Sequence, residues 1–225
     1  MPPSDLTTEE ITYWKEIEVI TGGLLDELKS NKLLKNEKEW GIDSLSQLGE
    51  MSRLFNAHMD TATALSAAFE SKRVAITSSL IDLGVGFTSL NVTTIWVYDV
   101  LGVFVENTEL LKNHFLLLLR MDGKTFKSDM TLGWLTRSLE DTCPEYGHRF
   151  NAEIKVDLRN SLSHGLYWFR KDPSGNDSLC YVKELGSNPK EIPGSQIREI
   201  VKQSNLLTIC FVELIGVRAT NGYFK

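Results

Sequence analysis

One short run of the chain combines an arginine and a histidine at a spacing that suits phosphate chemistry. In residues 157–165, which read DLRNSLSHG, Arg159 and His164 enclose four residues, the first of them Asn160. A guanidinium is permanently charged and presents a fork that matches phosphate oxygens, so it can stabilise charge that builds on phosphorus. An imidazole can accept or donate a proton near neutral pH. The two groups suit metal-free cleavage of an RNA phosphodiester, in which the ribose 2′-hydroxyl is the internal nucleophile.

This run resembles the hallmark of the HEPN family (higher eukaryotes and prokaryotes nucleotide-binding domain). The hallmark is an arginine, four to six residues of which the first is polar, and then a histidine. Residues 158–169 look like the end of the helix that carries that motif, and residues 131–135 look like the preceding helix. The resemblance covers about residues 73–220 and leaves residues 1–72 without a counterpart.

The resemblance implies a metal-independent ribonuclease without a cofactor, with Arg159 and His164 as the active pair and Asn160 assisting. The neighbouring candidates for RNA contacts are Ser161, Ser163 and Tyr167. Members of the family often act in prokaryotic defence or as toxins with a neutralising protein partner. Other members have lost activity, so the alternative is a non-catalytic helical module that binds RNA, nucleotide or a partner protein.

The positions of the two residues on a helix raise a geometric difficulty. At about 100° per residue, Arg159 and His164 would lie about 140° apart on an ideal helix and would not share a face. They could act together if the helix ends early, or if a second chain supplies a partner, so we expect a homodimer with a shared site. Two structural roles stay open: Arg159 could pair with Asp157 or Glu153, and His164 could satisfy free carbonyls at the helix end.

The elements around the motif are mostly helical. Patterns of apolar residues predict helices at 7–28, 44–69, 74–105, 107–119, 128–139, 150–162 and 195–214, with a weak point at Gly84 and Gly86. Capping signals stand at Thr7, Ser44, Asn107 and Ser128, and Gly165 suits the position after a helix end. Residues 166–170 and 179–185 change period and predict a β-hairpin. We therefore expect an all-α helical bundle with a small hairpin after the motif helix, built as a single compact unit in which residues 1–72 form an N-terminal helical extension.

Composition and charge indicate the location of this protein and the partners that it can bind. The chain has 225 residues, a net charge of −6 and three widely spaced cysteines, which predict neither a disulfide framework nor a zinc site. The acidity belongs to residues 1–106, with a net of −8, whereas residues 107–225 carry +2. The apolar run at 74–105 contains Asp82 and Asp99, so a buried helix pair is favoured over a membrane span. We expect a cytoplasmic protein with no metal site and no membrane partner, whose partner is RNA.

Overall fold

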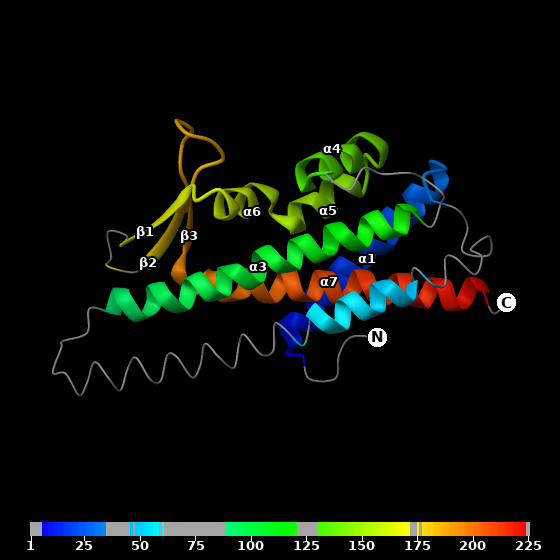
Figure 1. Cartoon of the computed structure of the whole chain (residues 1–225), viewed down its shortest axis with the longest axis horizontal. Helices are drawn as coiled ribbons and strands as arrows, with labels where there is room; N and C mark the ends of the chain where they lie inside the picture. The colour runs from blue at the N-terminus through cyan, green and yellow to red at the C-terminus, as the bar shows by residue number, and fades with distance from the viewer. Residues whose placement is uncertain are drawn as a thin grey trace. The chain divides into compact units, whose positions relative to one another are not determined.

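The computed structural model describes residues 6–34, 46, 48–58, 60, 89–120, 130–171, 175 and 177–223. Its elements in chain order are α1 (Thr8–Ser30), α3 (Ser89–Arg120), α4 (Leu132–Thr142), α5 (Gly147–Ile154), α6 (Val156–Ser163), β1 (Tyr167–Lys171), β2 (Asp177–Tyr181), β3 (Lys190–Pro193) and α7 (Gly194–Tyr223) (Figure 1). Residues 48–58 are also helical. The protein is mainly helical with a small antiparallel sheet, as the sequence predicted.

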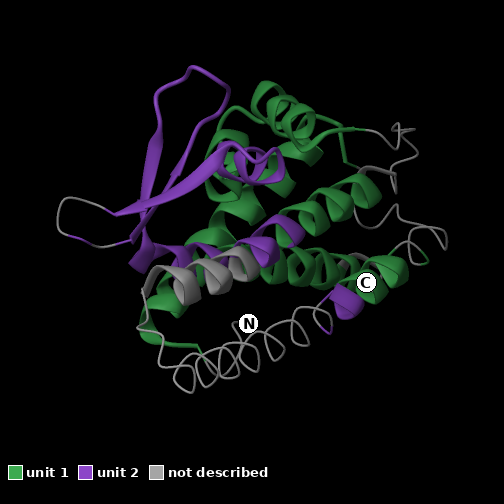
Figure 2. Ribbon diagram, turned by 60° about the vertical axis from the view of Figure 1, so that its left-hand side comes forward, with its two compact units in different colours: residues 1–55, 107–156, 203–225 green, residues 56–106, 157–202 purple. Residues whose placement is uncertain are grey.

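The chain divides into two units, shown in different colours in Figure 2. Unit 1 comprises residues 1–55, 107–156 and 203–225, and unit 2 comprises residues 56–106 and 157–202. The long helices α3 and α7 contribute residues to both units. The expected boundary between residues 72 and 73 lies outside the described residues, as do the weak point at Gly84 and Gly86 and the cap at Ser128.

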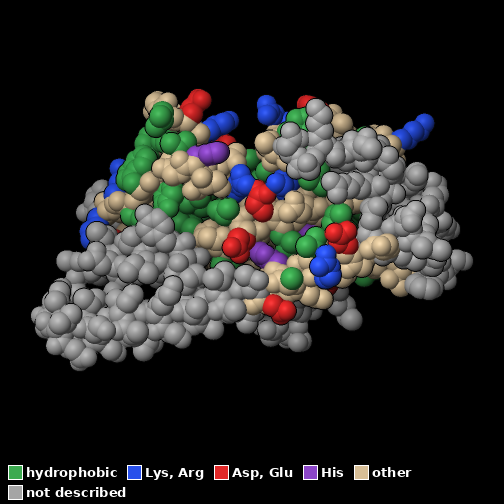
Figure 3. Space-filling model, in the orientation of Figure 1, with side chains coloured by type: hydrophobic (Ala, Val, Ile, Leu, Met, Phe, Trp, Pro, Cys, Tyr) green, Lys and Arg blue, Asp and Glu red, His purple; other side chains and the backbone are tan. Residues whose placement is uncertain are grey.

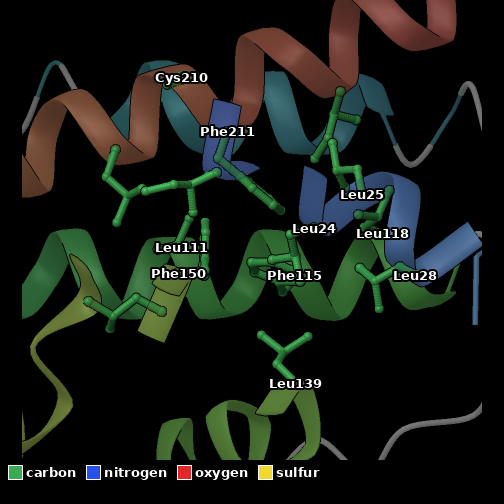
Figure 4. Packing of buried hydrophobic residues seen from close by; sticks show 14 of the residues in the cluster. Leu24, Leu25, Leu28, Leu111, Phe115, Leu118, Leu139, Phe150, Cys210 and Phe211 are labelled. Carbon is green, nitrogen blue, oxygen red and sulfur yellow. The ribbon is translucent and has the colours of Figure 1, made fainter. Parts of the chain in front are cut away.

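An aromatic cluster lies at the centre of unit 1. The ring centroids of Phe115 and Phe211 are 4.3 Å apart, and those of Phe115 and Phe150 are 5.3 Å apart (Figure 4). All three side chains are fully buried, and they come from α3, α5 and α7. Leucines of α1, including Leu24 and Leu28, complete the same core. Burying a large aromatic side chain stabilises a fold by several kcal/mol, so this cluster is the main anchor of unit 1.

Helix α1 begins where its capping signal predicted. Thr7 is the N-cap, its hydroxyl accepts a hydrogen bond from the Glu10 amide, and the Glu10 carboxylate accepts one from the Thr7 amide. This reciprocal pair satisfies two amides that the helix itself leaves without partners. The side chains of Trp14, Ile17 and Ile20 then recur at helical spacing and are buried in unit 1.

The prediction of a helix start at Asn107 is wrong. Helix α3 runs through this position from Ser89, and the Asn107 side chain is buried. Its amide donates to Ser204 Oγ at 2.9 Å and to Asn205 Oδ1 at 2.6 Å. A buried amide of this kind needs partners, and α7 supplies them, so the polar residue joins two helices instead of starting one.

The predicted helix over residues 150–162 is two helices. Helix α5 ends at Ile154, Lys155 takes the left-handed conformation with φ 52° and ψ 51°, and α6 begins at Val156. The break divides the apolar stripe between two cores. Phe150 and Ile154 are buried in unit 1, whereas Leu158 is buried in the core of unit 2. Helix α4 likewise begins later than predicted, at Leu132, where Thr131 caps it by accepting from the Trp134 amide.

The predicted hairpin is present, with a third strand that the sequence did not predict. Strands β1, β2 and β3 pair in that order, each antiparallel to the next. Side chains on one face of this sheet join the core of unit 2, which also holds Leu158 of α6. The core-facing residues of the sheet are Tyr167, Phe169, Leu179, Tyr181 and Ile192. The sheet therefore buries one face and leaves the other, which we call the outer face, to the remaining side chains.

Helix α7 is long and carries a long apolar stretch. Over Gly194–Asn221 it meets the length and composition of a membrane-crossing helix, and half of its most apolar window is buried inside the protein. The core helix of a globular protein meets the same criteria, and Leu207, Phe211 and Ile215 of α7 pack in the core of unit 1.

Candidate functional site

The motif residues lie on α6 and in the turn that ends it, all within unit 2. Helix α6 is short, and its buried side chains are Leu158 and Ser161. Leu158 packs in the core of unit 2 beside residues of the sheet. The helix is thereby held at its centre, and Arg159 and Asn160 follow this anchor directly.

The end of α6 has the geometry that Gly165 predicted. Gly165 has φ +69°, its amide lies 3.4 Å from the Leu162 carbonyl, and the Leu166 amide donates to the Ser161 carbonyl at 2.8 Å. These two contacts form a Schellman motif, in which a residue with positive φ follows the helix. The amide of His164 still donates to the Asn160 carbonyl at 3.0 Å, while its side chain is exposed. His164 is therefore presented to solvent by a defined turn.

Arg159 is half-buried and is positioned by its neighbour. Its Nη1 donates to Oδ1 of Asn160 at 3.1 Å. Burial lowers the pKa of Arg159, but arginine stays charged in proteins. The Asn160 side chain is itself half-buried and accepts this bond, so it restricts the directions that the guanidinium can take.

The two carboxylates expected as structural partners of Arg159 have other contacts. Asp157 accepts from Lys190 Nζ at 2.8 Å, and Lys183 Nζ lies 3.9 Å from the same carboxylate. Glu153 belongs to unit 1, where it accepts from the Tyr13 hydroxyl at 2.7 Å. Burial, and then Glu153, raise the pKa of Tyr13 far above its ordinary value. The phenol therefore stays neutral and acts as a donor.

The three candidate RNA contacts fall in different environments. Ser163 is exposed at the end of α6. Ser161 is buried, and its hydroxyl lies 2.7 Å from the Asp157 carbonyl and 2.8 Å from the Val182 carbonyl. Tyr167 is half-buried in the core of unit 2, with its ring 6.2 Å from and edge-on to that of Phe169. The exposed group at this helix end is therefore His164 with Ser163, whereas Ser161 and Tyr167 hold α6 and β1 in place.

In the ion pairs of unit 2, the cationic side chains are more exposed than the carboxylates, which a count of charges does not reveal. The carboxylates are Glu191, Asp177 and Asp157, and their partners are Arg170, Lys171 and the two lysines Lys183 and Lys190. The side chains of these cations are 49% to 71% exposed, but those of the carboxylates are only 22% to 36% exposed. Solvent therefore meets the positive member of each pair first, although the formal charges nearly balance.

Trp168 is exposed on the sheet of unit 2, which the sequence did not predict. It is 42% exposed and lies directly opposite Cys180 in the pairing of β1 with β2. Its neighbours Tyr167 and Phe169 point to the core, so alternation along the strand places Trp168 on the outer face. The alternation was visible in the sequence of β1, but the side that faces the core was not.

Comparison with known proteins assigns no relative: no protein-family model, no curated protein and no solved structure matches this chain. Among the residues that the structure describes, no group of three or more histidine, cysteine, aspartate or glutamate side chains could hold a metal ion.

Proposed function

We propose that this protein is a metal-independent endoribonuclease of HEPN type, in which Arg159 and His164 act at the end of α6. The observation that carries the proposal is the presentation of His164: a Schellman turn exposes its imidazole, five residues beyond a guanidinium that Asn160 restrains. Within this proposal the protein adopts the all-α bundle of that family, works in the cytoplasm, and takes part in defence or acts as a toxin that a second protein neutralises.

The proposed reaction uses the RNA's own 2′-hydroxyl. An imidazole accepts the hydroxyl proton as the 2′-oxygen forms a bond to phosphorus. The bond from phosphorus to the 5′-oxygen breaks, and an imidazolium gives that oxygen a proton. Arg159 stabilises the negative charge on the phosphoryl oxygens. The products are a 2′,3′-cyclic phosphate and a free 5′-hydroxyl, and DNA is excluded because it lacks the nucleophile.

The surface of unit 2 supports an RNA partner despite the net charge of −6. Affinity for nucleic acid depends on cations that reach phosphates. The ion pairs of the sheet expose their lysine and arginine members more than their carboxylates. Such a surface attracts a polyanion at short range, where the exposed charges count more than the sum over the chain.

We also propose that two chains share the working site. Metal-free cleavage uses a base on one side of phosphorus and an acid on the other, and the motif supplies one histidine. A twofold axis near the end of α6 would place two such pairs around one phosphate. Refolding wild-type chains with His164→Ala chains tests this arrangement. If both histidines are required, activity falls with the square of the wild-type fraction, whereas a linear fall contradicts a shared site.

One observation favours the alternative, a non-catalytic module that binds RNA, nucleotide or a partner protein. The Arg159 guanidinium is half-buried and hydrogen-bonded to its neighbour, which suits a positioning role as well as a catalytic one. The two functions differ in one outcome, because a module binds RNA and leaves it intact.

The deciding experiment incubates purified protein with mixed RNA in EDTA and maps the product ends. We expect cleavage with 2′,3′-cyclic phosphate or derived 3′-phosphate ends, no cleavage of DNA of the same sequence, and a loss of about 100- to 1,000-fold in Arg159→Ala. The matched control is Arg137→Ala, since Arg137 is an exposed arginine of α4 in unit 1. Intact RNA, or strict dependence on Mg²⁺ or Mn²⁺, contradicts the proposal.

A further inference from the structure

The outer face of the sheet carries an aromatic side chain beside a cation. Antiparallel register places Trp168, Cys180 and Glu191 in one row across the three strands, and Arg170 belongs to the same face two residues after Trp168. Arg170 pairs with Glu191 across this face. Cys180 is fully buried between neighbours that are themselves exposed.

Trp168 is exposed, whereas the other aromatic residues of the sheet are packed against the core. Tyr167, Phe169 and Tyr181 all pack against the core of unit 2. Trp168 leaves 42% of its surface to water instead. A tryptophan ring has a broad π-face that prefers an aromatic or cationic partner, so an exposed one beside an exposed arginine has the features of a stacking platform.

We infer that Trp168 is a stacking subsite for one unpaired base of a single-stranded RNA. This inference rests on the proposed function, because it names how the same substrate is held. Charge complementarity supports the occupant: Arg170 is 56% exposed and lies on the same face as Trp168. Strand alternation places Lys171 and Lys190 on the opposite face, so Arg170 is the cation of this group that a nucleotide on Trp168 meets. Figure 3 shows hydrophobic side chains over the sheet with lysine and arginine side chains at its margins. A base stacks on the ring while a neighbouring phosphate meets Arg170.

Chain connectivity sets how far the subsite lies from the motif. Trp168 follows His164 by four residues, and four residues of extended chain span at most about 14 Å. Successive nucleotides of one strand are about 3.4 Å apart along a stacked DNA duplex, and an unstacked strand spaces them further apart. A base held on Trp168 therefore lies within a few nucleotides of a phosphate held at His164. The subsite selects single-stranded RNA, because bases within a duplex are stacked on each other and cannot cover the ring.

The test measures binding separately from cleavage. The probe is a fluorescently labelled six-nucleotide 2′-deoxy oligonucleotide, which offers bases and phosphates but lacks the nucleophile. We expect Trp168→Ala to weaken its binding to the full-length protein by about 5- to 100-fold, the range of one stacked base. Trp168→Phe keeps a ring and should restore most of the affinity. The matched control is Trp134→Ala, because Trp134 is also 42% exposed but belongs to α4 of unit 1, and we expect no change.

A second probe distinguishes stacking from a loss of structure. It is an abasic sugar-phosphate chain of the same length, which keeps the charges and lacks the bases. Wild-type protein and Trp168→Ala should bind it equally, whereas a misfolded variant would lose affinity for both probes. Equal affinity of wild type and Trp168→Ala for the base-containing probe would overturn the stacking subsite, even if the protein cleaves RNA. Intact RNA in EDTA together with Trp168-dependent binding would overturn the nuclease and keep the subsite.

Discussion

Among the described residues, the lysine and arginine ion pairs of the two units differ in which member is more exposed. In unit 1 the lysine and arginine members are 18% to 26% exposed and the carboxylates 30% to 64% exposed. In unit 2 the order is reversed, with cations at 49% to 71% and carboxylates at 22% to 36%. Both arrangements neutralise formal charge. The reversal shows that a net charge of −6 does not describe the surface that a polyanion would meet.

The aromatic cluster of unit 1 and the aromatic side chains of the sheet in unit 2 differ in burial. Unit 1 buries Phe115, Phe150 and Phe211 in one cluster. Unit 2 packs Tyr167 and Phe169 in its core and leaves Trp168 exposed on the outer face of the sheet. We therefore expect substitutions in the cluster of unit 1 to reduce stability, and substitutions on the sheet of unit 2 to change RNA binding.

The largest effect on stability is expected at Phe211. Phe211→Ala removes a fully buried ring that packs against Phe115 and leaves a cavity, so it should lower the free energy of unfolding by about 3–5 kcal/mol. Val217→Ala is the control on the same helix, because Val217 is exposed and should cost little. Denaturant unfolding measures both. A loss below about 1 kcal/mol for Phe211→Ala would contradict the assignment of this cluster as the anchor of unit 1.

A smaller effect is expected at the turn that presents His164. Gly165→Ala forces a side chain into the left-handed conformation, so the free energy of unfolding should fall by about 1–2 kcal/mol. Gly165→Asn should cost less, since asparagine tolerates this conformation. Thermal unfolding measures the difference, and cleavage of RNA should fall with the loss of the turn. Equal stability of the alanine variant and wild type would contradict the turn geometry.

The exposed cations of unit 2 should contribute through salt-dependent binding. Within the proposed RNA surface Lys183 contacts one phosphate, so Lys183→Ala should decrease the slope of log affinity for single-stranded RNA against log salt by about 0.7. Lys15→Ala on α1 is the control, because Lys15 is equally an exposed lysine but belongs to unit 1. Fluorescence anisotropy at several salt concentrations measures the slope. An unchanged slope for Lys183→Ala would remove this side chain from the RNA surface.

The smallest effect concerns Asp26, an exposed carboxylate of unit 1. Burial alone would raise the pKa of Asp26, but the hydrogen bond and charge of Arg218, with the charge of Lys29, hold it below its ordinary value. A lowered pKa in the folded state stabilises the protein above the unfolded-state pKa of about 3.9, and this contribution disappears as the pH falls through the folded-state pKa. The pair is solvent-screened, so its worth is below about 1 kcal/mol. Asp26→Asn should flatten the acid limb of stability against pH, and an unchanged limb would contradict the role of this pair.

Local signals predicted the parts of the fold that local interactions determine. The capping box at Thr7 and Glu10 starts α1, and Gly165 ends α6 in a Schellman motif, each through contacts within six residues. The hairpin was also visible in the change of apolar period before and after residues 172–176. Its third strand was not, because the pairing of β3 with β2 depends on contacts that no short window contains.

Two errors arose where tertiary contacts override local preference. No glycine marks the break at Lys155 in the sequence. The apolar residues continue across the break at helical spacing, although they pack in two different cores. Asn107 has a residue type that favours helix starts, but Ser204 and Asn205 hold it inside α3. For the candidate site, spacing identified Arg159 and His164 but not their exposure. The sequence also did not predict that Trp168 lies on the outer face, because this depends on which face of the sheet packs against the core.

The most direct test of the proposed ribonuclease compares two histidines. His164 and His148 are both exposed, but His164 ends α6 in unit 2 and His148 lies on α5 in unit 1. The measurement is the initial rate of RNA cleavage in EDTA by His164→Ala, by His148→Ala and by wild type. We expect His164→Ala to lose about 100- to 10,000-fold, the contribution of a general acid or base, and His148→Ala to stay within about twofold of wild type. Equal rates for the two variants would contradict catalysis by His164.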